Sequence, residues 1–580
     1  MWIRELHIRN FRCIETLKMA FPKGLSVIVG ENNAGKTAVI DALRLMLFHG
    51  RDYDALRINE DDFRAGTDYA PIEISCTFCK LTEGDESNFM ECLVKVDKDE
   101  FEARLSVRLE FNPDTRRVNM KWWGGETEGS SLPSNLYDYI SCVYLQPLRD
   151  PESGLAPSRY SQVSRLIGRL ATEKDRKRVE SIADKANRII GKVEPVKKAK
   201  AVIDGQMSAI TGPEMSQNMD LAFSDPEFQS IIARIQTKID NLPVSLNGLG
   251  YNNLVYTAAT LSALRQGEHY RSILIEEPEA HLHPQLQVLL LNYLETTASE
   301  REGNNVQIIT SSHSPILASQ ATLDSLVTLQ RSDSGVSSVS VATLAMDPII
   351  KKKLHRFLDA TRAELFFAKK ILMVEGIAEA LLCPVLARML GVDLKTSAVS
   401  VINADGINFN AFLPLFGKDG IKVPVALMSD KDANAIGGGA SDSWKKLKCA
   451  EADCTNLKVV GPDITFEHEL ARSSLLLPFM IDAFKNLMPI IGSQLEADLA
   501  EITNQDKKAD LFYNVFLEKK LSKGRFAQEL AYVLDDSGLS ASAVPPCIRE
   551  AMVFLGLTGA TKENEQAGGT EETDPVPEAD

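Results

Sequence analysis

Two patterns of hydrophobic and polar positions alternate along the first 150 residues of the chain. The run at 25–29 is almost continuously apolar, as is typical of a strand that is buried on both faces of a parallel sheet. Near 71–78 and 104–111, apolar and polar residues alternate, which predicts antiparallel strands with one solvated face. A helix is expected over 36–48. This region is therefore predicted to combine an antiparallel layer with parallel α/β structure.

The pattern becomes helical between about 155 and 240. Within it, the segment 174–200 contains ten Lys or Arg residues and four Asp or Glu residues. Such a charge run is consistent with a solvated helix face, and also with an arm that faces DNA or another copy of the chain. Strand–helix alternation returns over 246–345, so the helical segment is interpreted as an insert into one α/β domain.

A second α/β unit is expected to start near residue 366. Apolar runs at 371–374, 398–402 and 423–428 predict three of its strands, with helices between them, as a parallel sheet requires. Residues 470–557 have a mostly helical pattern. The segment 562–580 has seven acidic residues and one lysine, and is predicted to be disordered.

Composition and charge narrow the function classes. A chain of 580 residues is too long for one compact domain. The net charge of −16 argues against a general nucleic-acid coat, although a local basic strip can still bind phosphates on an acidic protein. Neither a long apolar run nor a signal-peptide pattern is present, so we expect a cytoplasmic chain without membrane contact. The nine scattered cysteines favour a reduced protein.

The segment from Gly30 to Thr37 fits the phosphate-binding pattern GxxxxGK[ST] at every required position. It follows an apolar strand and opens a helix, which is the context such a loop needs. Its glycines allow backbone N–H groups to surround phosphates, and the helix N-terminus favours their charge. Lys36 is expected to reach the β- and γ-phosphates of ATP, and the Thr37 hydroxyl to bind Mg²⁺. The other nucleotide contacts expected in this loop are Asn33, Gly35 and Ala38.

A later apolar strand ends in two adjacent carboxylates, Glu276 and Glu277. At the strand tip, Glu276 suits the Mg²⁺ ion that accompanies ATP, and Glu277 is placed to polarise the attacking water. His313 follows another apolar run and is expected to sense the γ-phosphate. Together these residues predict a complete ATPase site.

These motifs resemble the ATP-binding cassette heads of the structural-maintenance-of-chromosomes (SMC) type. The opening strand is similar to that of the family, which adds Arg12 to the expected nucleotide contacts. Gly248 and Gly250 lie where the family has its signature loop, and Gln146 is similar to its lid glutamine. In such heads the signature loop of one protomer closes on the nucleotide of another. The resemblance therefore implies a homodimer or a higher oligomer.

Three apolar runs of the second unit each end in acidic residues. The first ends at Glu375, with Glu379 in the following helical turn, the second ends at Asp405, and the third ends at Asp430 and Asp432. Parallel strands carry their carboxyl ends to one sheet edge, so we expect these acids to converge. Carboxylates can share a site in this number only with bound cations, and oxygen ligands favour Mg²⁺ or Mn²⁺. Two such ions can activate a water and stabilise the leaving oxygen of a phosphodiester.

This order of acids resembles a Toprim domain. An ATPase head directly before a Toprim domain resembles the OLD (overcoming lysogenization defect) family of nucleases, and the resemblance covers about 1–535. Glu467 and Glu469 resemble the family's later acidic motif, which implies further metal ligands. Lys523 resembles its C-terminal lysine, which implies stabilisation of the charge on the scissile phosphate.

The expected fold class is thus α/β: an ABC/SMC-like ATPase head with a helical dimerisation insert, followed by a Toprim α/β domain with a helical C-terminal part. The expected domains are the N-terminal part of the head (1–154), the insert (155–240), the C-terminal part of the head (241–345), the Toprim domain (366–470), its helical C-terminal part (471–557) and the acidic tail (558–580).

The resemblance implies an ATP-binding, divalent-metal-dependent DNA endonuclease or nickase, with one ion beside ATP and two Mg²⁺ or Mn²⁺ ions in the Toprim site. Family members are frequently antiviral defence effectors, some with a helicase-like or reverse-transcriptase and noncoding-RNA partner encoded nearby. Whether ATP powers or restrains cleavage stays open. The alternatives are an ATP-dependent DNA-repair enzyme, a topoisomerase-like or primase-like Toprim enzyme, and a non-catalytic ATP-gated DNA clamp.

Overall fold

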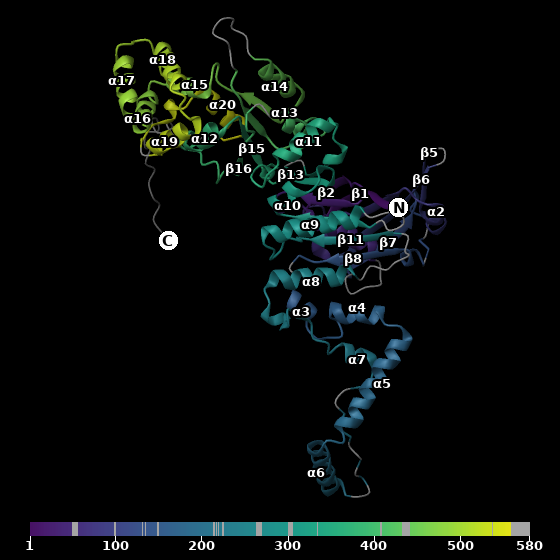
Figure 1. The fold of residues 1–580 in the computed structure, drawn as a ribbon. Helices are drawn as coiled ribbons and strands as arrows, with labels where there is room; N and C mark the ends of the chain where they lie inside the picture. Colours follow the sequence, from purple (N-terminus) through teal and green to yellow (C-terminus); the bar gives the residue numbers. More distant parts are fainter. Residues whose placement is uncertain are drawn as a thin grey trace, which may run out of the picture. The chain divides into compact units, whose positions relative to one another are not determined.

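The computed structural model divides the chain into two compact units, Met1–Ala342 and Thr343–Asp580 (Figure 1). The bounds of the six domains expected above stay predictions. The expected disorder of the acidic tail concerns residues outside those that the structure describes. The described residues are 1–48, 56–97, 100–129, 132–133, 135–147, 150–212, 215, 217, 220–222, 225–262, 270–299, 306–332, 335–406, 409–431, 441–535 and 537–557.

Unit 1 begins with an antiparallel sheet, in which β2, β1, β4, β6 and β5 follow one another and β7 pairs with β6. The alternating pattern near 71–78 and 104–111 correctly predicted β4 and β6, whose apolar side chains face the core. The strands are β1 (Trp2–Phe11), β2 (Ile14–Ala20), β4 (Ile72–Cys79), β5 (Leu93–Asp97), β6 (Glu100–Asn112) and β7 (Arg117–Gly124).

A second sheet of unit 1 has the order β14-β13-β3-β12-β11-β8. All neighbours pair in parallel except β13 and β14. Every residue of β3, β11 and β12 is buried, as the nearly continuous apolar run of β3 predicted for that strand. The strands are β3 (Leu25–Val29), β8 (Ile140–Leu145), β11 (Tyr270–Glu276), β12 (Gln307–Ser312), β13 (Leu326–Ser332) and β14 (Gly335–Ser340).

Helix α1 (Lys36–Leu47) contacts strands of both sheets. Its apolar side chains join those of β1, β4 and β6 in one buried cluster. Helix α9 (Pro284–Ser299) also contacts β3 and β12. Because α1 is fixed by a core on both sides, the loop that precedes it is held in place.

The insert of unit 1 is mostly helical, as its pattern predicted, with a two-stranded hairpin that the pattern did not predict. No residue of α5 or α6 is buried. Among the described residues, no helix is both long and apolar enough to cross a membrane. The elements between β8 and β11, which extend beyond the insert, are α3 (Pro151–Leu155), α4 (Gln162–Leu170), α5 (Glu173–Ile190), α6 (Glu194–Thr211), α7 (Phe228–Ile232), β9 (Lys238–Ile239), β10 (Leu242–Pro243) and α8 (Leu249–Leu261).

Unit 2 contains a parallel sheet with the order β16-β15-β17-β18. The sequence predicted the first three strands in chain order and missed the fourth. The strands are β15 (Lys370–Val374), β16 (Val399–Asn403), β17 (Val425–Met428) and β18 (Leu457–Val460). The main helices are α11 (Pro348–Phe357), α12 (Ile377–Met389), α14 (Asp442–Asp453), α15 (Phe466–Arg472), α16 (Leu477–Leu487), α17 (Pro489–Ala500), α18 (Gln505–Glu518), α19 (Lys523–Asp535) and α20 (Pro546–Phe554).

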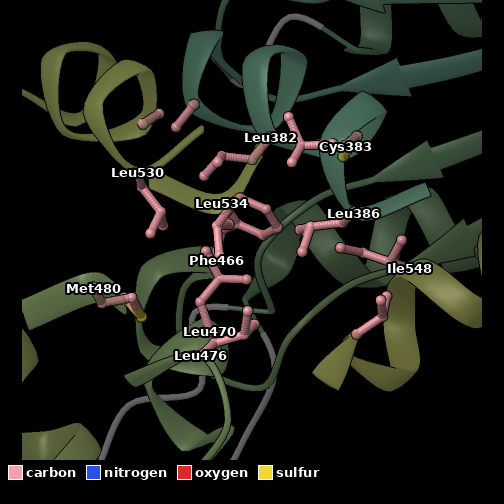
Figure 2. Close-up of a cluster of buried hydrophobic side chains, with 14 of the residues drawn as sticks. Leu382, Cys383, Leu386, Phe466, Leu470, Leu476, Met480, Leu530, Leu534 and Ile548 are labelled. Carbon is pink, nitrogen blue, oxygen red and sulfur yellow. The ribbon is translucent and has the colours of Figure 1, made fainter. Parts of the chain in front are cut away.

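One hydrophobic cluster joins α12, α15 and α19 (Figure 2). Its central side chains are fully or almost fully buried. Truncating such a side chain to alanine typically costs about 2–5 kcal/mol, so the three helices are held tightly against one another. The side chains from these helices in Figure 2 are Leu382, Cys383 and Leu386, Phe466 and Leu470, and Leu530 and Leu534.

Candidate ATPase and nuclease sites

The loop between β3 and α1 depends on glycine. Gly30 has φ 154° and Gly35 has φ 101°, in the region that side chains rarely adopt. At Gly30 a Cβ atom would also lie 2.1 Å from the carbonyl oxygen of Leu329. The loop can therefore pass under β13 only without a side chain at this position, and its N–H groups remain available to phosphates.

Lys36 starts α1 and is 4% exposed. Its ammonium donates hydrogen bonds to the carbonyl oxygens of Gly30 (2.6 Å) and Glu31 (2.7 Å). Burial lowers the pKa of Lys36 to about 8, against the opposing charges of Glu277, Glu279 and Glu31. The side chain is thus folded along the loop, where the negative charge of a phosphate would favour its protonated form.

A cavity of about 620 Å³ opens over this loop and brings most of the expected ATPase residues together. Among its wall residues, the sequence reasoning overlooked Arg331, which comes from β13 on the far side of the loop. The residues that line the cavity are Arg12, Cys13, Asn32, Asn33, Gly35, Lys36, Thr37, Ala38, Glu277, His313 and Arg331.

Arg12 lies in the wall of this cavity with its guanidinium held by two carboxylates. Its Nη1 atom is 2.6 Å from Asp41, and its Nε atom is 2.7 Å from Asp62. Burial disfavours the charge, but the two carboxylates outweigh it and raise the pKa of Arg12. The side chain therefore presents a fixed positive charge beside the phosphate loop.

Glu276 ends β11 and is 2% exposed. Its Oε1 atom accepts a hydrogen bond from the Tyr144 hydroxyl at 2.7 Å. Burial raises the pKa of Glu276, while hydrogen bonds from Tyr144 and Thr37 lower it. The two expected Mg²⁺ ligands of the ATPase, Thr37 and Glu276, thus touch each other. Tyr144 was missed because only the pairing of β8 with β11 brings it there.

Glu277 and His313 face each other beside the loop. The Glu277 carboxylate lies 3.6 Å from His313 Nε2, and both side chains are 37% exposed. Burial and the nearby Lys36 charge lower the pKa of His313, against Glu277. Glu279, which the sequence reasoning did not single out, accepts hydrogen bonds from the His313 backbone N–H (2.6 Å) and the Ser312 hydroxyl (2.9 Å). It therefore fixes the turn that carries the histidine.

The remaining ATPase residues lie apart from the cavity wall. Gln146 directly follows Leu145, which pairs with Ile275, so Gln146 lies beside the tip of the acidic strand. Gly248 and Gly250 are at the start of α8, and a Cβ atom at Gly250 would lie 2.8 Å from the His281 carbonyl oxygen. Their part in nucleotide binding stays a prediction.

In unit 2 the ends of β15 and β17 are tied together. One carboxylate oxygen of Glu375 accepts hydrogen bonds from the Ser429 hydroxyl (2.8 Å) and the Asp430 backbone N–H (3.2 Å). Glu379 accepts a hydrogen bond from the Gly376 backbone N–H (3.0 Å), the position of a carboxylate in a capping box. The sheet edge and the start of α12 thereby bring these acids to one place.

The pKa shifts of these acids follow from their burial and from one another's charges. Burial, followed by the charges of Glu375 and Glu379, raises the pKa of Asp430 to about 8, while Lys523 opposes the shift. The pKa of Glu379 is also raised, by burial and by the charges of Glu467 and Glu375. Asp430, Glu375, Glu379, Glu467 and Lys523 form what we call the carboxylate cluster.

Glu467 is the most deeply buried member, at 1% exposure. The Lys523 ammonium lies 3.0 Å from its Oε2 atom, and among the described residues no other group hydrogen-bonds to either carboxylate oxygen. A buried carboxylate with a single cationic partner is costly. Its chemistry fits a cation site, because a divalent ion would supply the missing charge.

Two expected members, Glu469 and Asp405, do not join this cluster in the structure. Glu469 lies two residues beyond Glu467, on another side of α15, and its carboxylate lies 3.4 Å from Arg472. Asp405 is 69% exposed and lies 3.9 Å from Arg362, at the end of the edge strand β16. Asp432 lies outside the described residues. Within the described part of the chain, no three acidic, His or Cys side chains converge closely enough to hold one ion.

Two family models match the chain. Residues 1–121 and 132–318 match an AAA ATPase domain, and residues 366–432 match the Toprim domain of proteins like the overcoming lysogenization defect protein. An OLD nuclease from Thermus scotoductus is 27% identical over 434 residues, which cover 70% of this chain and 77% of the relative. The endonuclease GajA from Bacillus cereus is 23% identical over 431 residues, which cover 71% of this chain and 72% of the relative.

Solved structures also show similarity. The C-terminal region of the Xanthomonas campestris pv. campestris OLD protein is 26% identical with a TM-score of 0.25, covering 33% of this chain and 95% of that one. An Smc head bound to the C-winged-helix domain of ScpA is 18% identical with a TM-score of 0.34, covering 60% of this chain and 100% of that one.

Proposed function

Because this chain belongs to the OLD nuclease family, with an AAA ATPase domain followed by an OLD-like Toprim domain, we propose that it is an ATP-controlled, divalent-metal-dependent DNA endonuclease. The ATPase head and Toprim domain expected from the sequence are thereby confirmed, and both domains are those of an enzyme. The observation that carries the proposal is the carboxylate cluster, in which four buried or half-buried acids share one lysine.

The ATPase and Toprim domains imply use of a nucleotide and of divalent metal. In the proposed nuclease site, Glu375, Asp430 and Glu467 hold two Mg²⁺ or Mn²⁺ ions, with Asp432 as a further ligand. Such ions supply an activated water and stabilisation of the leaving oxygen. Glu379 takes the proton of the attacking water, because the buried position that raises its pKa favours the protonated form.

Lys523 has a separate role in this proposal. Its pKa is raised by Glu467, Asp430 and Glu379 despite partial burial, so the side chain carries a positive charge beside the acids. When DNA binds, its ammonium donates to a non-bridging oxygen of the scissile phosphate and stabilises the charge that develops there.

In the proposed ATPase site, Lys36 and the loop amides bind the phosphates of ATP, and Arg12 adds charge at the wall. Thr37 and Glu276 hold the Mg²⁺ that accompanies the nucleotide, Glu277 orients water, and His313 responds to the γ-phosphate. Gln146 is assigned to the same ion from its place beside β11. The hydrolysis or release of ATP then changes the access of DNA to unit 2.

A homodimer is supported by two features of unit 1. Gly248 and Gly250 do not line the cavity of their own chain, as a signature loop that serves a second copy would not. Helices α5 and α6 also expose large apolar side chains, a pattern that marks an interaction surface. Replacing Ile189 and Ile210 with glutamate should convert the dimer to a monomer in light scattering. The exposed apolar residues are Ile182, Ile189, Val193, Val202, Ile203, Met207 and Ile210.

The biological role is proposed as resistance to phage. The description of the matched family, overcoming lysogenization defect, supports this role. A helicase-like protein, or a reverse transcriptase with a noncoding RNA, encoded nearby is the proposed partner. Cells that express the chain should plate phage less efficiently than cells that express Glu467→Gln, and equal plating would contradict the role.

Cleavage of supercoiled plasmid tests the nuclease directly. With Mg²⁺ or Mn²⁺ we expect nicked and linear products without a covalent protein–DNA adduct. Glu467→Gln should abolish them, whereas the matched variant Glu469→Gln, two residues along the same helix, should not. Closed relaxed circles would identify a topoisomerase instead. Intact plasmid with either metal, with and without ATP, would contradict the proposal.

A further inference from the structure

We propose that one face of α5 binds the backbone of duplex DNA and so delivers the substrate of the proposed nuclease, on which this inference rests. The face, here called the basic stripe, is made of exposed side chains along the outer side of the helix. Its members are Lys174, Lys177, Arg178, Lys185 and Arg188.

The positions of these residues place them on one line. Counted from Lys174, the other four lie 3, 4, 11 and 14 residues further on. At 3.6 residues per turn, these four side chains point within about 60° of the direction of Lys174. The row spans 14 residues, which is about 21 Å along the helix axis. Lys192 follows in the turn after the helix and is also exposed. The result is a straight row of cations rather than a scattered charge run.

The opposite side of α5 is the one that packs on the protein. The Arg176 guanidinium lies 5.0 Å from the centre of the Phe228 ring of α7, and the Phe228 backbone N–H donates to the Glu180 carboxylate at 3.4 Å. Because these contacts fix the inner side, the basic stripe points away from α7. Figure 1 shows α5 running past α7.

The cations of the basic stripe have few partners of their own. Arg178 has an acidic neighbour, Asp175, one turn earlier. Within the described part of the chain, the side chains of the other four form no hydrogen bond or ion pair. The chain as a whole carries a net charge of −16. A row of five cations, four of them without a hydrogen bond or ion pair from the side chain, marks a surface for a polyanion on so acidic a protein.

Duplex DNA fits this row better than an anionic membrane. A helix that lies in a membrane turns its apolar side to the lipid, with cations flanking that side. Here the apolar Ile182 and Ile189 lie at one edge of the basic stripe, and the acidic Glu173 and Asp184 lie at its other edge. A duplex needs only phosphate contacts, at about one charge per 1.7 Å of its axis, and a straight row provides them.

The test measures duplex binding by the full chain without divalent metal, so that no cleavage occurs. A fluorescein-labelled blunt duplex is titrated at several salt concentrations. Each phosphate contact contributes about −0.9 to the slope of log K against log salt. The variant Lys177→Gln/Arg178→Gln/Lys185→Gln should therefore flatten the slope by about 2.7 and lower the affinity near 0.1 M salt by roughly 100-fold.

A matched control removes the same number of charges from the neighbouring helix α6. Two of the three lysines there already have acidic partners, because Lys197 lies 3.4 Å from Glu194 and Lys200 lies 3.1 Å from Asp220. The variant Lys197→Gln/Lys198→Gln/Lys200→Gln should bind the duplex as the natural chain does. An equal loss in both variants would overturn the proposal, since it would reflect net charge alone.

Other outcomes are equally decisive. Glutamine is a good helix former, and unchanged ATP turnover by the α5 variant would exclude a folding defect. Unchanged duplex binding by that variant would overturn the proposal that the basic stripe binds DNA. Binding of the natural chain to phosphatidylserine vesicles, but not to the duplex, would overturn it in favour of a membrane surface. The α5 variant should still cleave plasmid at low salt, because its nuclease site is intact. If instead the nuclease assignment were wrong, the natural chain would bind the duplex but would not cleave plasmid.

Discussion

The nucleotide cavity of unit 1 and the carboxylate cluster of unit 2 both bury acidic groups, but they neutralise them differently. In the cavity, Glu276 accepts a hydrogen bond from Tyr144, and Arg12 is held by two carboxylates. In the cluster, Glu467 has Lys523 as its single close partner, and Asp430 has its pKa raised to about 8. The acids of the first site are paired within the chain, whereas the four acids of the second share one cation, Lys523.

This difference predicts how each site responds to its ligands. A site whose polar groups already have partners keeps its shape before the ligand arrives. A cluster of buried carboxylates is a source of instability that divalent ions relieve. The predictions below separate the two sites, in order of decreasing effect.

Replacing one acid of the carboxylate cluster should abolish nuclease activity and leave ATPase activity unchanged. Glu379→Ala should lower plasmid cleavage by about 10³-fold or more, because the residue is proposed to take the proton of the water. Turnover of ATP by unit 1 should stay within experimental error. A parallel fall in ATP turnover would show that the two sites do not function separately.

Replacing residues of the nucleotide cavity should abolish or slow ATP hydrolysis. Lys36→Ala should abolish ATP binding in equilibrium dialysis, because it removes the cation that faces the phosphates. Glu277→Gln should still bind ATP but turn it over about 10²–10³-fold more slowly. Unchanged turnover in either variant would refute the assignment of these residues.

Divalent metal should stabilise unit 2 more than ATP-free unit 1. At an Mg²⁺ or Mn²⁺ concentration of about 100 times its Kd, the gain is about 2.7 kcal/mol, or roughly 5–10 °C in the Tm of a unit of this size. Differential scanning calorimetry of the natural chain and of Asp430→Asn measures the gain. The variant should unfold at a higher temperature without metal and gain less from it. An equal gain in both would remove Asp430 from the metal site.

The smallest expected effect concerns Tyr144. Tyr144→Phe removes the hydroxyl that donates to the buried Glu276 carboxylate, which costs about 1–3 kcal/mol. We expect a modest, several-fold fall in ATP turnover and no change in plasmid cleavage. Turnover equal to that of the natural chain would mean that Thr37 suffices to orient Glu276.

Local pattern was enough to predict the phosphate loop, because glycine spacing, strand and helix all lie within one short segment around Gly30 and Lys36. It also predicted β15, β16 and β17. It missed β18 (Leu457–Val460), because Lys458 interrupts its short apolar run. Tyr144, Glu279 and Arg331 were missed for another reason: each reaches the ATPase site only through the pairing or turning of strands that are distant in the sequence.

The two acids at the start of α15 show where simple geometry helps. Glu467 and Glu469 were treated as equal candidates. On a helix, residues two apart point in directions about 200° apart, so they cannot be expected to face the same site. The structure brings Glu467 to the cluster and leaves Glu469 beside Arg472. Asp405 follows β16, which pairs with β15, but its side chain is 69% exposed and lies 3.9 Å from Arg362 instead of among the acids.

The order in which the cluster is assembled along the chain has a consequence for synthesis. Glu375 and Asp430 are translated well before Lys523, which lies at position 523 of 580 on α19. A ribosome adds about 5–20 residues each second, so for several seconds a nascent chain carries the whole sheet without the lysine. The carboxylate cluster of a nascent chain is therefore expected to be complete only after α19 has been synthesised.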